Sequence, residues 1–442
     1  MQQYSEYKAS GVQWLGEIPS HWEVKRLGKI CKFSKGLQFT KTDLVNQGIA
    51  VVSYGQVHAK YNKRTHLSDD LIRFIPSDFR GKNEKAKVEI GDFIVADTSE
   101  DIEGCGNMAF NDCIEGLYGG SHTILIKELQ IACKKYLSYF FNCTQWRSQI
   151  RSLVNGVKVY TINRDILKQS NVICPSKEEQ KNIVNYLDIV TSNIDKAITQ
   201  QQKMIDLLNE RKQIIINNAV TKGLEPNVKM KDSGVEWIGK IPVHWKVRKL
   251  KFLLVTTLQY GANESAESDD ESYPRYIRIT DIDEEGHLKP ETFRSLLPSK
   301  AEPYLLKKGD ILFARSGATA GKTYLFKEDF KACFAGYLIR AKLKEILAPE
   351  YLNYYTKSGI YDSWKKSIFI QATIPNIGAD KYANLHITLP PKDDQHYIVQ
   401  HLNMEVGKIN QIIKKCNQQI SLLQERKQII INDVVTGKVK VV

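Results

Sequence analysis

A glycine-rich stretch at residues 317–323, Gly-Ala-Thr-Ala-Gly-Lys-Thr, has the residue types of a phosphate-binding loop. A P-loop places four residues between its glycines so that backbone amides surround the phosphates, and this stretch places only three. Residues 324–326 have the pattern of a strand, whereas a P-loop opens a helix. The stretch therefore argues against ATP binding and favours contact with DNA phosphates or base edges by Arg315, Ser316, Thr319 and Lys322.

The equivalent stretch in the first half of the chain, residues 97–101, is Asp-Thr-Ser-Glu-Asp and is acidic. Carboxylates are poor partners for phosphates, but they accept hydrogen bonds from the amino group of cytosine. The difference between the two stretches is the pattern expected when two related modules read different DNA sequences.

Other basic and polar side chains gather in stretches that differ between the two halves. Lys and Arg anchor phosphates, and side chains of these types also form hydrogen bonds with base edges. Each one alone is more often an ordinary surface residue, so it is their grouping that favours DNA reading. The candidates are Lys35, Gln38, Thr40, Lys41, Arg147, Arg151, Asn155, Lys158 and Tyr160 in the first half, and Arg275, Arg278, Lys365, Lys366, Gln371 and Thr373 in the second.

Motifs for self-contained catalysis are missing from the sequence. No glycine-rich nucleotide-binding fingerprint follows an early strand, and there is no Asn-Pro-Pro-Tyr or Asp-Pro-Pro-Tyr run of an amino-methyltransferase. Residues 389–392, Leu-Pro-Pro-Lys, lack both the acidic or amide residue and the aromatic residue of that run. A nuclease motif that begins with Pro-Asp has no such dipeptide here. We therefore expect no catalytic residues.

The composition favours a polyanionic partner, most simply nucleic acid. The chain has 442 residues and a formal net charge of +13, enough length for two or three domains and a high charge. The sequence has no apolar run long enough to cross a membrane and no signal peptide at its start, so we expect reduced thiols in the cytoplasm. Four of the eight cysteines surround His122 without the Cys-x-x-Cys pairing of a zinc site, so we expect no metal: Cys105, Cys113, Cys133 and Cys143.

Two blocks show that the chain is an internal duplication. Residues 10–27 begin Ser-Gly-Val-Gln-Trp-Leu-Gly-Glu-Ile-Pro-Ser-His-Trp, and residues 233–250 repeat two Trp, a Pro and a His at the same offsets. A functional reading would make His21 and His244 ligands or bases, but no Asp, Ser or Cys partner accompanies them in the block. We favour a docking segment whose Trp side chains pack against a scaffold.

Two long segments organise the rest of the chain. Residues 207–217, Leu-Leu-Asn-Glu-Arg-Lys-Gln-Ile-Ile-Ile-Asn, recur almost unchanged at 422–432, and steps of four and three upstream of each copy indicate a coiled-coil seam. Ser176 and Glu179 fit a capping box at the first start. Some 40 residues make a helix of about 60 Å. A helix of that length with one apolar stripe is not stable alone, so we expect an intramolecular antiparallel pair with a globular unit at each end. Two charged triplets read as solvated or partner-facing: Glu210, Arg211 and Lys212, and Glu425, Arg426 and Lys427.

The seam of the first helix is predicted at Ile183, Leu187, Val190, Ile194, Ala197, Gln201, Met204 and Leu208. In the second helix it is predicted at Ile398, Leu402, Glu405, Ile409, Ile412, Cys416, Gln419 and Leu423. Between the repeats each half has a Gly-Asp turn followed by an apolar strand, at 91–96 and 309–314, then a further strand and a short amphipathic helix. The sequence therefore predicts an α+β fold with two mixed modules built on one scaffold.

On the paired openings and the paired long helices, the chain resembles the specificity subunits of type I restriction–modification systems. Residues 309–317, Gly-Asp-Ile-Leu-Phe-Ala-Arg-Ser-Gly, are similar to a recurrent stretch of the target recognition domains of that family. The resemblance covers nearly the whole chain and implies a pseudo-twofold repeat. Its segments would be a first target recognition domain at 1–176, a first long helix at 177–224, a second recognition domain at 225–391 and a second long helix at 392–442.

The resemblance also implies a division of labour. Each recognition domain would read one half of a bipartite double-stranded DNA site, and the helices would set the gap and bind two methyltransferase subunits. Those subunits would carry S-adenosylmethionine, and separate restriction subunits would translocate and cut, so this chain would hold no cofactor and catalyse nothing. Independently, modules about 60 Å apart, less their overhang, would have reading faces one to two turns of DNA apart at ~34–36 Å per turn.

Two alternatives stay open from the residues. The first is a fused or type II-like restriction enzyme with catalysis in the variable loops; a purified chain that is inert on DNA with S-adenosylmethionine or Mg²⁺ would exclude it. The second is a structural adaptor that binds proteins and no DNA, for which binding would lack the steep salt dependence of phosphate contacts.

Overall fold

The structure is a computed structural model of the chain. It describes residues 2–79, 84–129, 132–154, 156, 158–266, 268–283, 286–369 and 375–441. The chain divides into two compact units: unit 1 consists of Met1–Gln201 and Gln418–Val442, and unit 2 of Gln202–Asn417. Each unit is of mixed α and β structure and includes part of both long helices, so the α+β fold and the internal repeat are confirmed. The segment boundaries drawn from the sequence stay a prediction.

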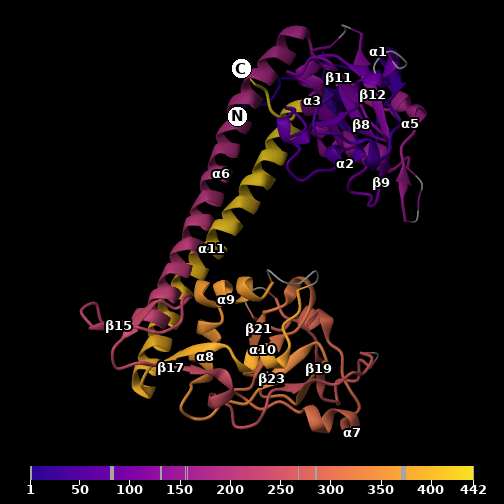
Figure 1. Ribbon diagram of the computed structural model, residues 1–442. Coiled ribbons are helices and arrows are strands. Elements are labelled where there is room, and N and C mark those ends of the chain that lie inside the picture. The colour runs from indigo at the N-terminus through magenta and orange to yellow at the C-terminus, as the bar shows by residue number, and fades with distance from the viewer. Residues whose placement is uncertain are drawn as a thin grey trace. The chain divides into compact units, whose positions relative to one another are not determined.

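The two long helices are α6, Lys177–Lys222, and α11, Lys392–Val435 (Figure 1). The capping box at the start of α6 is confirmed, because the Glu179 carboxylate accepts from Ser176 Oγ at 2.9 Å and Glu179 N donates to Ser176 Oγ at 3.2 Å. Gly223 and Gly437 follow the two helices with φ of 74° and 79°, the left-handed conformation that lets a chain leave a helix. Within the described residues, no helix is long and apolar enough to cross a membrane.

The coiled-coil seam is confirmed at most of its apolar positions, including Ile194, Leu208, Ile409 and Cys416 in its middle, which are buried. Ile183, Leu187, Ile398 and Leu402 are buried as predicted. Met204 is 49% exposed while its neighbour Ile205 is buried, and Ile412 is likewise 44% exposed. The seam resumes four residues later at Leu208 and Cys416, so the two exposed positions are local departures from it.

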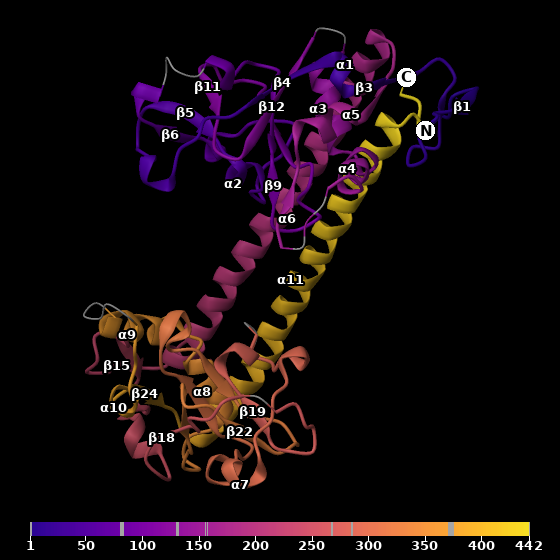
Figure 2. The same ribbon diagram turned by 90° about the vertical axis from the view of Figure 1, so that its right-hand side faces the viewer.

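Unit 1 contains two four-stranded sheets, in the orders β10-β8-β12-β4 and β6-β5-β11-β7 (Figure 2). The strands of the first sheet are β10 Met108–Phe110, β8 Phe93–Ala96, β12 Thr123–Glu128 and β4 Cys31–Lys35. Those of the second are β6 Arg73–Ile75, β5 Ile49–Val52, β11 Leu117–Gly119 and β7 Lys87–Val88. The two-stranded pairs are β1 Tyr7–Ala9 with β2 Glu17–Pro19, β3 Glu23–Arg26 with β14 Asn171–Cys174, and β9 Thr98–Ser99 with β13 Tyr160–Thr161. The helices are α1 Leu27–Ile30, α2 Tyr54–Val57, α3 Lys134–Asn142, α4 Thr144–Arg151 and α5 Arg164–Gln169.

Unit 2 repeats part of this plan: its described residues form one four-stranded sheet, where unit 1 has two. Its four-stranded sheet has the order β18-β23-β20-β21, from Gln259–Tyr260, Leu338–Ala341, Ile311–Ala314 and Thr323–Leu325. The two-stranded pairs are β15 Met230–Asp232 with β16 Lys240–Pro242, β17 Lys246–Lys249 with β24 His386–Leu389, and β19 Arg275–Ile277 with β22 Ala332–Phe334. The helices are α7 Pro298–Ala301, α8 Pro349–Tyr355, α9 Gly359–Phe369 and α10 Ala379–Ala383.

The strands predicted after the Gly-Asp turns lie at the centres of these sheets. Side chains of a strand alternate between its two faces, and β8 uses both faces for burial. Phe93 and Val95 enter the core that contains the long helices, whereas Ile94 and Ala96 enter a second core on the other face. In β20, Ile311 and Leu312 divide between two cores in the same way. A strand buried on both faces holds its next residue at a fixed position.

The modules are docked on the helices by contacts that recur 215 residues apart. Gln180 is buried, and its side chain accepts from Cys133 N at 2.7 Å and donates to Pro175 O at 2.8 Å. Gln395 makes the matching contacts with Ala348 N at 2.8 Å and Pro390 O at 2.9 Å in unit 2. The side chains of Asn432 and Asn217 accept from the first backbone N–H groups of α4 and α9, at 2.9 and 2.7 Å. The repeated residues of the long helices therefore fix the module beside them.

Candidate nucleic-acid interface

The loop after β20 starts from a rigid base. Arg315 N donates to Tyr337 O at 2.9 Å, and Arg315 O accepts from Ile377 N at 2.8 Å. The Arg315 guanidinium lies over the ring of Tyr260, with its carbon 5.2 Å from the ring centroid. The phenol of Tyr260 in turn accepts from Ala379 N at 3.0 Å. A cation–π contact of this kind favours one position of the guanidinium, whose planar donors suit a ligand with paired acceptors.

The same loop excludes a P-loop, as the spacing predicts. A short 3₁₀ turn, Gly317–Thr319, is followed by the strand β21 and not by a helix. Lys322 donates from Nζ to Ile282 O at 2.9 Å, so its ammonium is used within the protein. The loop thus offers Arg315, Ser316 and Thr319 outward, and it has no helix N-terminus for a nucleotide phosphate.

The loop after β8 occupies the equivalent position in unit 1. Asp97 N donates to His122 O at 3.0 Å, and Asp97 O accepts from Ile162 N at 2.8 Å, the bonds that Arg315 makes in unit 2. Ala96 pairs with Thr123 just as Ala314 pairs with Leu338. Asp97 is therefore the structural counterpart of Arg315, and His122 is the counterpart of Tyr337.

The neighbouring strand extends this equivalence. Lys35 pairs with Ile124 and Tyr260 pairs with Ile339, so Lys35 and Tyr260 are counterparts as well. The next residue is a glycine in both units, because a Cβ there would lie 2.2 Å from Gly120 O in unit 1 and 2.3 Å from Ala335 O in unit 2. The backbone is thus the same in both modules, and the side chains on it differ.

A cavity of about 790 Å³ opens beside the Asp97 loop in unit 1. Its lining combines aromatic rings, an acidic rim and arginines, including Tyr54, His58, Arg64, Glu100, His122 and Arg147. The Tyr54 ring contacts the rings of both His58 and His122, with centroids 6.3 and 5.6 Å apart. Rings beside charged groups suit a planar ligand such as a nucleobase.

Two residues of this cavity have left-handed backbone, with φ of 63° at Arg64 and 57° at His122. Such conformations are costly for side chains other than glycine, and they cluster at functional sites. Neither residue was predicted from the sequence, and neither were Tyr54 and His58, because the contacts that bring them together join distant segments. The one signal that could have pointed to them is their place in the stretches that differ between the halves.

Arg64 and Arg147 line this cavity, and Arg151 acts electrostatically on Arg147. Burial and the nearby guanidinium groups of Arg64 and Arg151 lower the pKa of Arg147 to about 9. Arg147 donates to Asn107 Oδ1 at 2.7 Å, and Arg151 pairs with Glu103 at 2.7 Å. The Nε atoms of Arg147 and Arg151 are buried without a hydrogen-bond partner. Like charges this close favour the approach of an anion such as a phosphate.

The other predicted contacts differ in how freely they face solvent. Arg275 is buried and donates to Lys289 O at 2.7 Å, and Arg278 forms a pair with Asp281 at 2.7 Å. Lys365 pairs with Asp362 at 2.7 Å. Thr40 and Asp43 form a capping box that uses the Thr40 side chain internally. Exposed candidates are Lys35, Gln38, Lys41, Lys158 and Lys366; Tyr160 is half-buried in β13, and Asn155, Gln371 and Thr373 lie outside the described residues.

The two charged triplets of the long helices divide in the same way in both copies. Glu210, Arg211, Glu425 and Arg426 are exposed. Lys427 pairs with Asp195 of α6 at 2.7 Å, and its copy Lys212 donates to Asn410 of α11 at 3.2 Å. Both lysines lie between the helices, so the exposed Glu-Arg pairs are the part of each triplet that is open to a partner.

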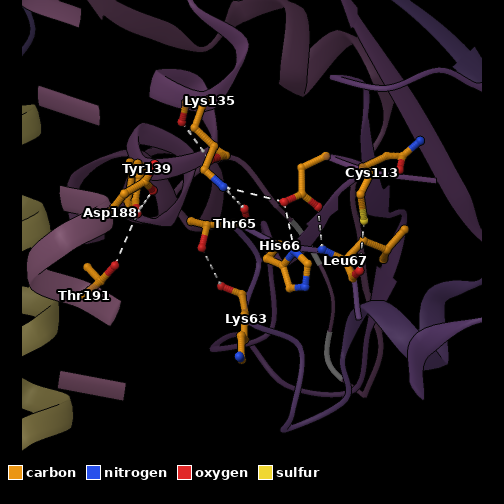
Figure 3. Close-up of polar contacts among 12 residues, drawn as sticks. Lys63, Thr65, His66, Leu67, Cys113, Lys135, Tyr139, Asp188 and Thr191 are labelled. Atoms are coloured by element: carbon orange, nitrogen blue, oxygen red, sulfur yellow. Dashed lines mark hydrogen bonds and ion pairs between the residues drawn. The ribbon is translucent and has the colours of Figure 1, made fainter. Parts of the chain in front are cut away.

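A groove of about 690 Å³ in unit 1 lies where α3 meets α6, and Figure 3 shows its polar contacts. The Tyr139 hydroxyl donates to Asp188 at 2.6 Å. Asp112 pairs with His66 at 2.8 Å and with Lys135 at 3.7 Å. His66, Asp112 and Cys113 have ligand atoms within 4.8 Å of one another, but the ammonium of Lys135 already neutralises the carboxylate that a metal would need. We read this cluster as an ion pair and not as a metal centre.

The duplicated His-Trp pairs find their partners on the long helices. His21 Nε2 lies 2.8 Å from Glu179 Oε1, and Trp22 Nε1 donates to the same oxygen at 3.2 Å. His244 and Trp245 repeat both contacts with Asp394, at 3.1 and 3.2 Å. The prediction of a docking segment is confirmed: the missing carboxylate comes from the first turn of the adjacent helix.

We expect the Glu179 contacts to stabilise unit 1 in a pH-dependent way. Burial alone would raise the pKa of Glu179, but hydrogen bonds from His21, Trp22 and Ser176 outweigh it and lower the pKa. The stabilisation is therefore complete above the unfolded pKa near 4.5 and is lost as the pH falls through the folded value. Urea unfolding of Glu179→Gln should show a deficit at neutral pH that shrinks in acid. Glu178→Gln, at the exposed neighbouring residue, is the control, and a deficit that does not change with pH would contradict the assignment.

Comparison with known proteins bears directly on these two modules. The model of the type I restriction modification DNA specificity domain matches residues 19–205 and 242–422. The chain is 26% identical to the type I restriction enzyme MjaVIII specificity subunit of Methanocaldococcus jannaschii, over 100% of this chain and 98% of that protein. It is 21% identical to the EcoKI specificity subunit of Escherichia coli strain K12, over 96% and 90%.

A solved structure has the same fold. It is a chain from work on complex assembly and conformational transition of the type I R-M system, with a TM-score of 0.68. The match covers 95% of this chain and 98% of that one at 15% identity, so it speaks to architecture and not to individual side chains. Each of the two matched stretches begins within one opening block and ends within one long helix, so the two matches follow the duplication.

Proposed function

This chain belongs to the family of type I restriction–modification DNA specificity domains, and on that premise we propose that it reads a bipartite DNA target, one half with each module. It is a DNA-specificity subunit and not a catalytic one, like the curated relatives that match it along their length. The alternative of a restriction enzyme with catalysis in its loops is not favoured.

The proposal rests on one observation: the two modules share a backbone arrangement but carry different side chains on it. The hydrogen bonds around Asp97 and Arg315 are the same, while an acid in one module stands where a base stands in the other. The difference falls at a position that both modules hold with the same backbone hydrogen bonds, which favours modules that read different partners over modules that share one. The net charge of +13 supports a phosphate backbone as partner.

We further propose that α6 and α11 act together as a ruler for an unread spacer. The exposed Glu210-Arg211 and Glu425-Arg426 pairs, repeated on the two helices, suit two copies of one partner, a methyltransferase subunit. That subunit would bring S-adenosylmethionine, and restriction subunits would join the same complex. The complex would work in the cytoplasm, on host DNA.

The test is co-expression with the cognate methyltransferase subunit and mapping of methylated adenines in the host DNA. We expect a single motif with two short halves and an unspecified spacer. Exchange of residues 30–175 for those of another specificity subunit should replace one half and leave the other unchanged. A continuous motif, or no motif, would contradict the proposal.

A further inference from the structure

Asp97 and Arg315 are the first residues beyond the central strands of the two modules, at equivalent backbone positions. Their N–H groups donate to the residue before the neighbouring strand, and their carbonyl groups accept from Ile162 and Ile377, both at 2.8 Å. The backbone before each residue is a strand buried on both faces. Either side chain therefore projects from backbone that is fixed by hydrogen bonds and follows a buried strand, an arrangement that favours specific reading of a ligand.

The carboxylate of Asp97 is partly open to solvent, since its side chain is 29% exposed. Oδ1 is buried and lies 3.4 Å from His122 Nδ1, so a contact with a ligand would be made by the other oxygen, Oδ2. A carboxylate only accepts hydrogen bonds. The base-edge groups in the major groove that donate to it are the amino groups of cytosine and adenine, and Glu or Asp to cytosine N4 is a common pairing.

The guanidinium of Arg315 has the opposite character. It only donates, and its carbon lies over the Tyr260 ring, 5.2 Å from the ring centroid. Among the described residues, no carboxylate forms an ion pair with it, whereas Arg278 pairs with Asp281 and Arg340 donates to Leu305 O. A planar pair of donors matches O6 and N7 of guanine in the major groove.

We propose that this shared position is the principal base-reading position of each module: Asp97 reads a cytosine or adenine, and Arg315 reads a guanine. The inference rests on the proposed function, and it adds a chemical class of base to each half of the target. The neighbouring side chains also differ between the modules: Lys35 and His122 flank Asp97, and Tyr260 and Tyr337 flank Arg315. These neighbours would add to the choice of base in each half-site.

The experiment uses the full chain co-expressed with its methyltransferase subunit and maps methylated adenines for the wild type, Arg315→Ala, Arg315→Lys and Asp97→Ala. Arg315→Ala should lose discrimination at one guanine of one half-site by about ten- to one-hundred-fold, and Asp97→Ala at one cytosine or adenine of the other half. Arg315→Lys should also lose that discrimination, because lysine keeps the charge without the bidentate fork.

Each of the other possible outcomes would refute a particular part of the proposal. A wild type without a bipartite motif refutes the proposed function itself. A bipartite motif that both alanine variants leave intact refutes only the reading position. Loss of methylation at all sequences alike, restored by Arg315→Lys, makes Arg315 a phosphate contact and overturns the reading of guanine. Circular dichroism of each variant, and its co-purification with the methyltransferase subunit, separate these outcomes from misfolding.

Discussion

Removal of one heptad from each long helix is expected to shorten the spacer of the DNA target by one to about three base pairs. Residues 200–206 of α6 and 415–421 of α11 occupy the same places in the two copies, 215 residues apart. Seven residues of helix are about 10 Å long at 1.5 Å per residue, and successive base pairs are about 3.4 Å apart. Three base pairs is thus the upper limit, reached only if the helices run along the DNA.

A heptad is the right unit because it preserves the seam. Deletion of seven residues returns each seam position to the same face of the helix within about 20°, whereas deletion of four moves it by about 40°. The contacts of Lys427 with Asp195 and of Lys212 with Asn410 lie outside the deleted residues and should persist. Both half-site sequences should therefore stay as they are.

The control exchanges the two heptads between the helices, which alters the sequence and keeps the length. Mapping of methylated adenines should show the wild-type spacer for the exchange and a shorter one for the double deletion. An unchanged spacer in the double deletion would refute the ruler and would locate the spacing in the modules themselves. Loss of the complex in the deletion alone would show that the methyltransferase subunits, and not the DNA, require the full length.

Periodic and repeated features of the fold could be predicted from the sequence because they depend on local rules. A Gly-Asp turn before four apolar residues was enough to place β8 and β20. Ser176 and Glu179 predict the start of α6 because their spacing is that of a capping box. The spacing of residues 317–323 argues against a P-loop, and the strand β21, which follows in place of a helix, confirms this.

Predictions of side-chain roles were weaker because they depend on partners from distant segments. Arg278 is a candidate DNA contact in the sequence, but in the structure its guanidinium forms an ion pair with Asp281 in a short turn. Lys212 and Lys427 looked partner-facing, but each finds its contact on the other helix. In the sequence His122 is notable only as the histidine among four cysteines, whereas in the structure it has a positive φ, contacts Tyr54 and lines a cavity. Tertiary contacts decide which of many basic groups remain available to DNA.

Replacement of Trp22 or Trp245 by Ala should have the largest effect on stability of any single change in the opening blocks. Both side chains are almost fully buried, at 0% and 1% exposure, in cores that include the ends of the long helices. Truncation of a buried Trp costs about 3–5 kcal/mol. Against a typical stability of about 5–15 kcal/mol for a whole domain, this is enough to unfold a marginal module.

The expected loss has two parts that can be separated. Trp→Ala removes the ring and also leaves the carboxylate of Glu179 or Asp394 without its indole donor, whereas Trp→Phe removes the donor and keeps most of the ring. The hydrogen bond to a charged group should contribute about 1.5–3 kcal/mol and packing the remainder. Urea unfolding, followed by circular dichroism, gives the free energy of unfolding for each variant.

Trp237→Ala supplies the matched control from the same block. Trp237 is only partly buried, and its indole N–H has no partner, so its loss should cost clearly less than that of Trp245. Equal losses at the two positions would mean that the block packs as a general hydrophobic patch, with no special role for the Trp-carboxylate contact. If the docking contact holds the module in reading position, Trp245→Ala should also remove specificity in one half of the target and spare the other.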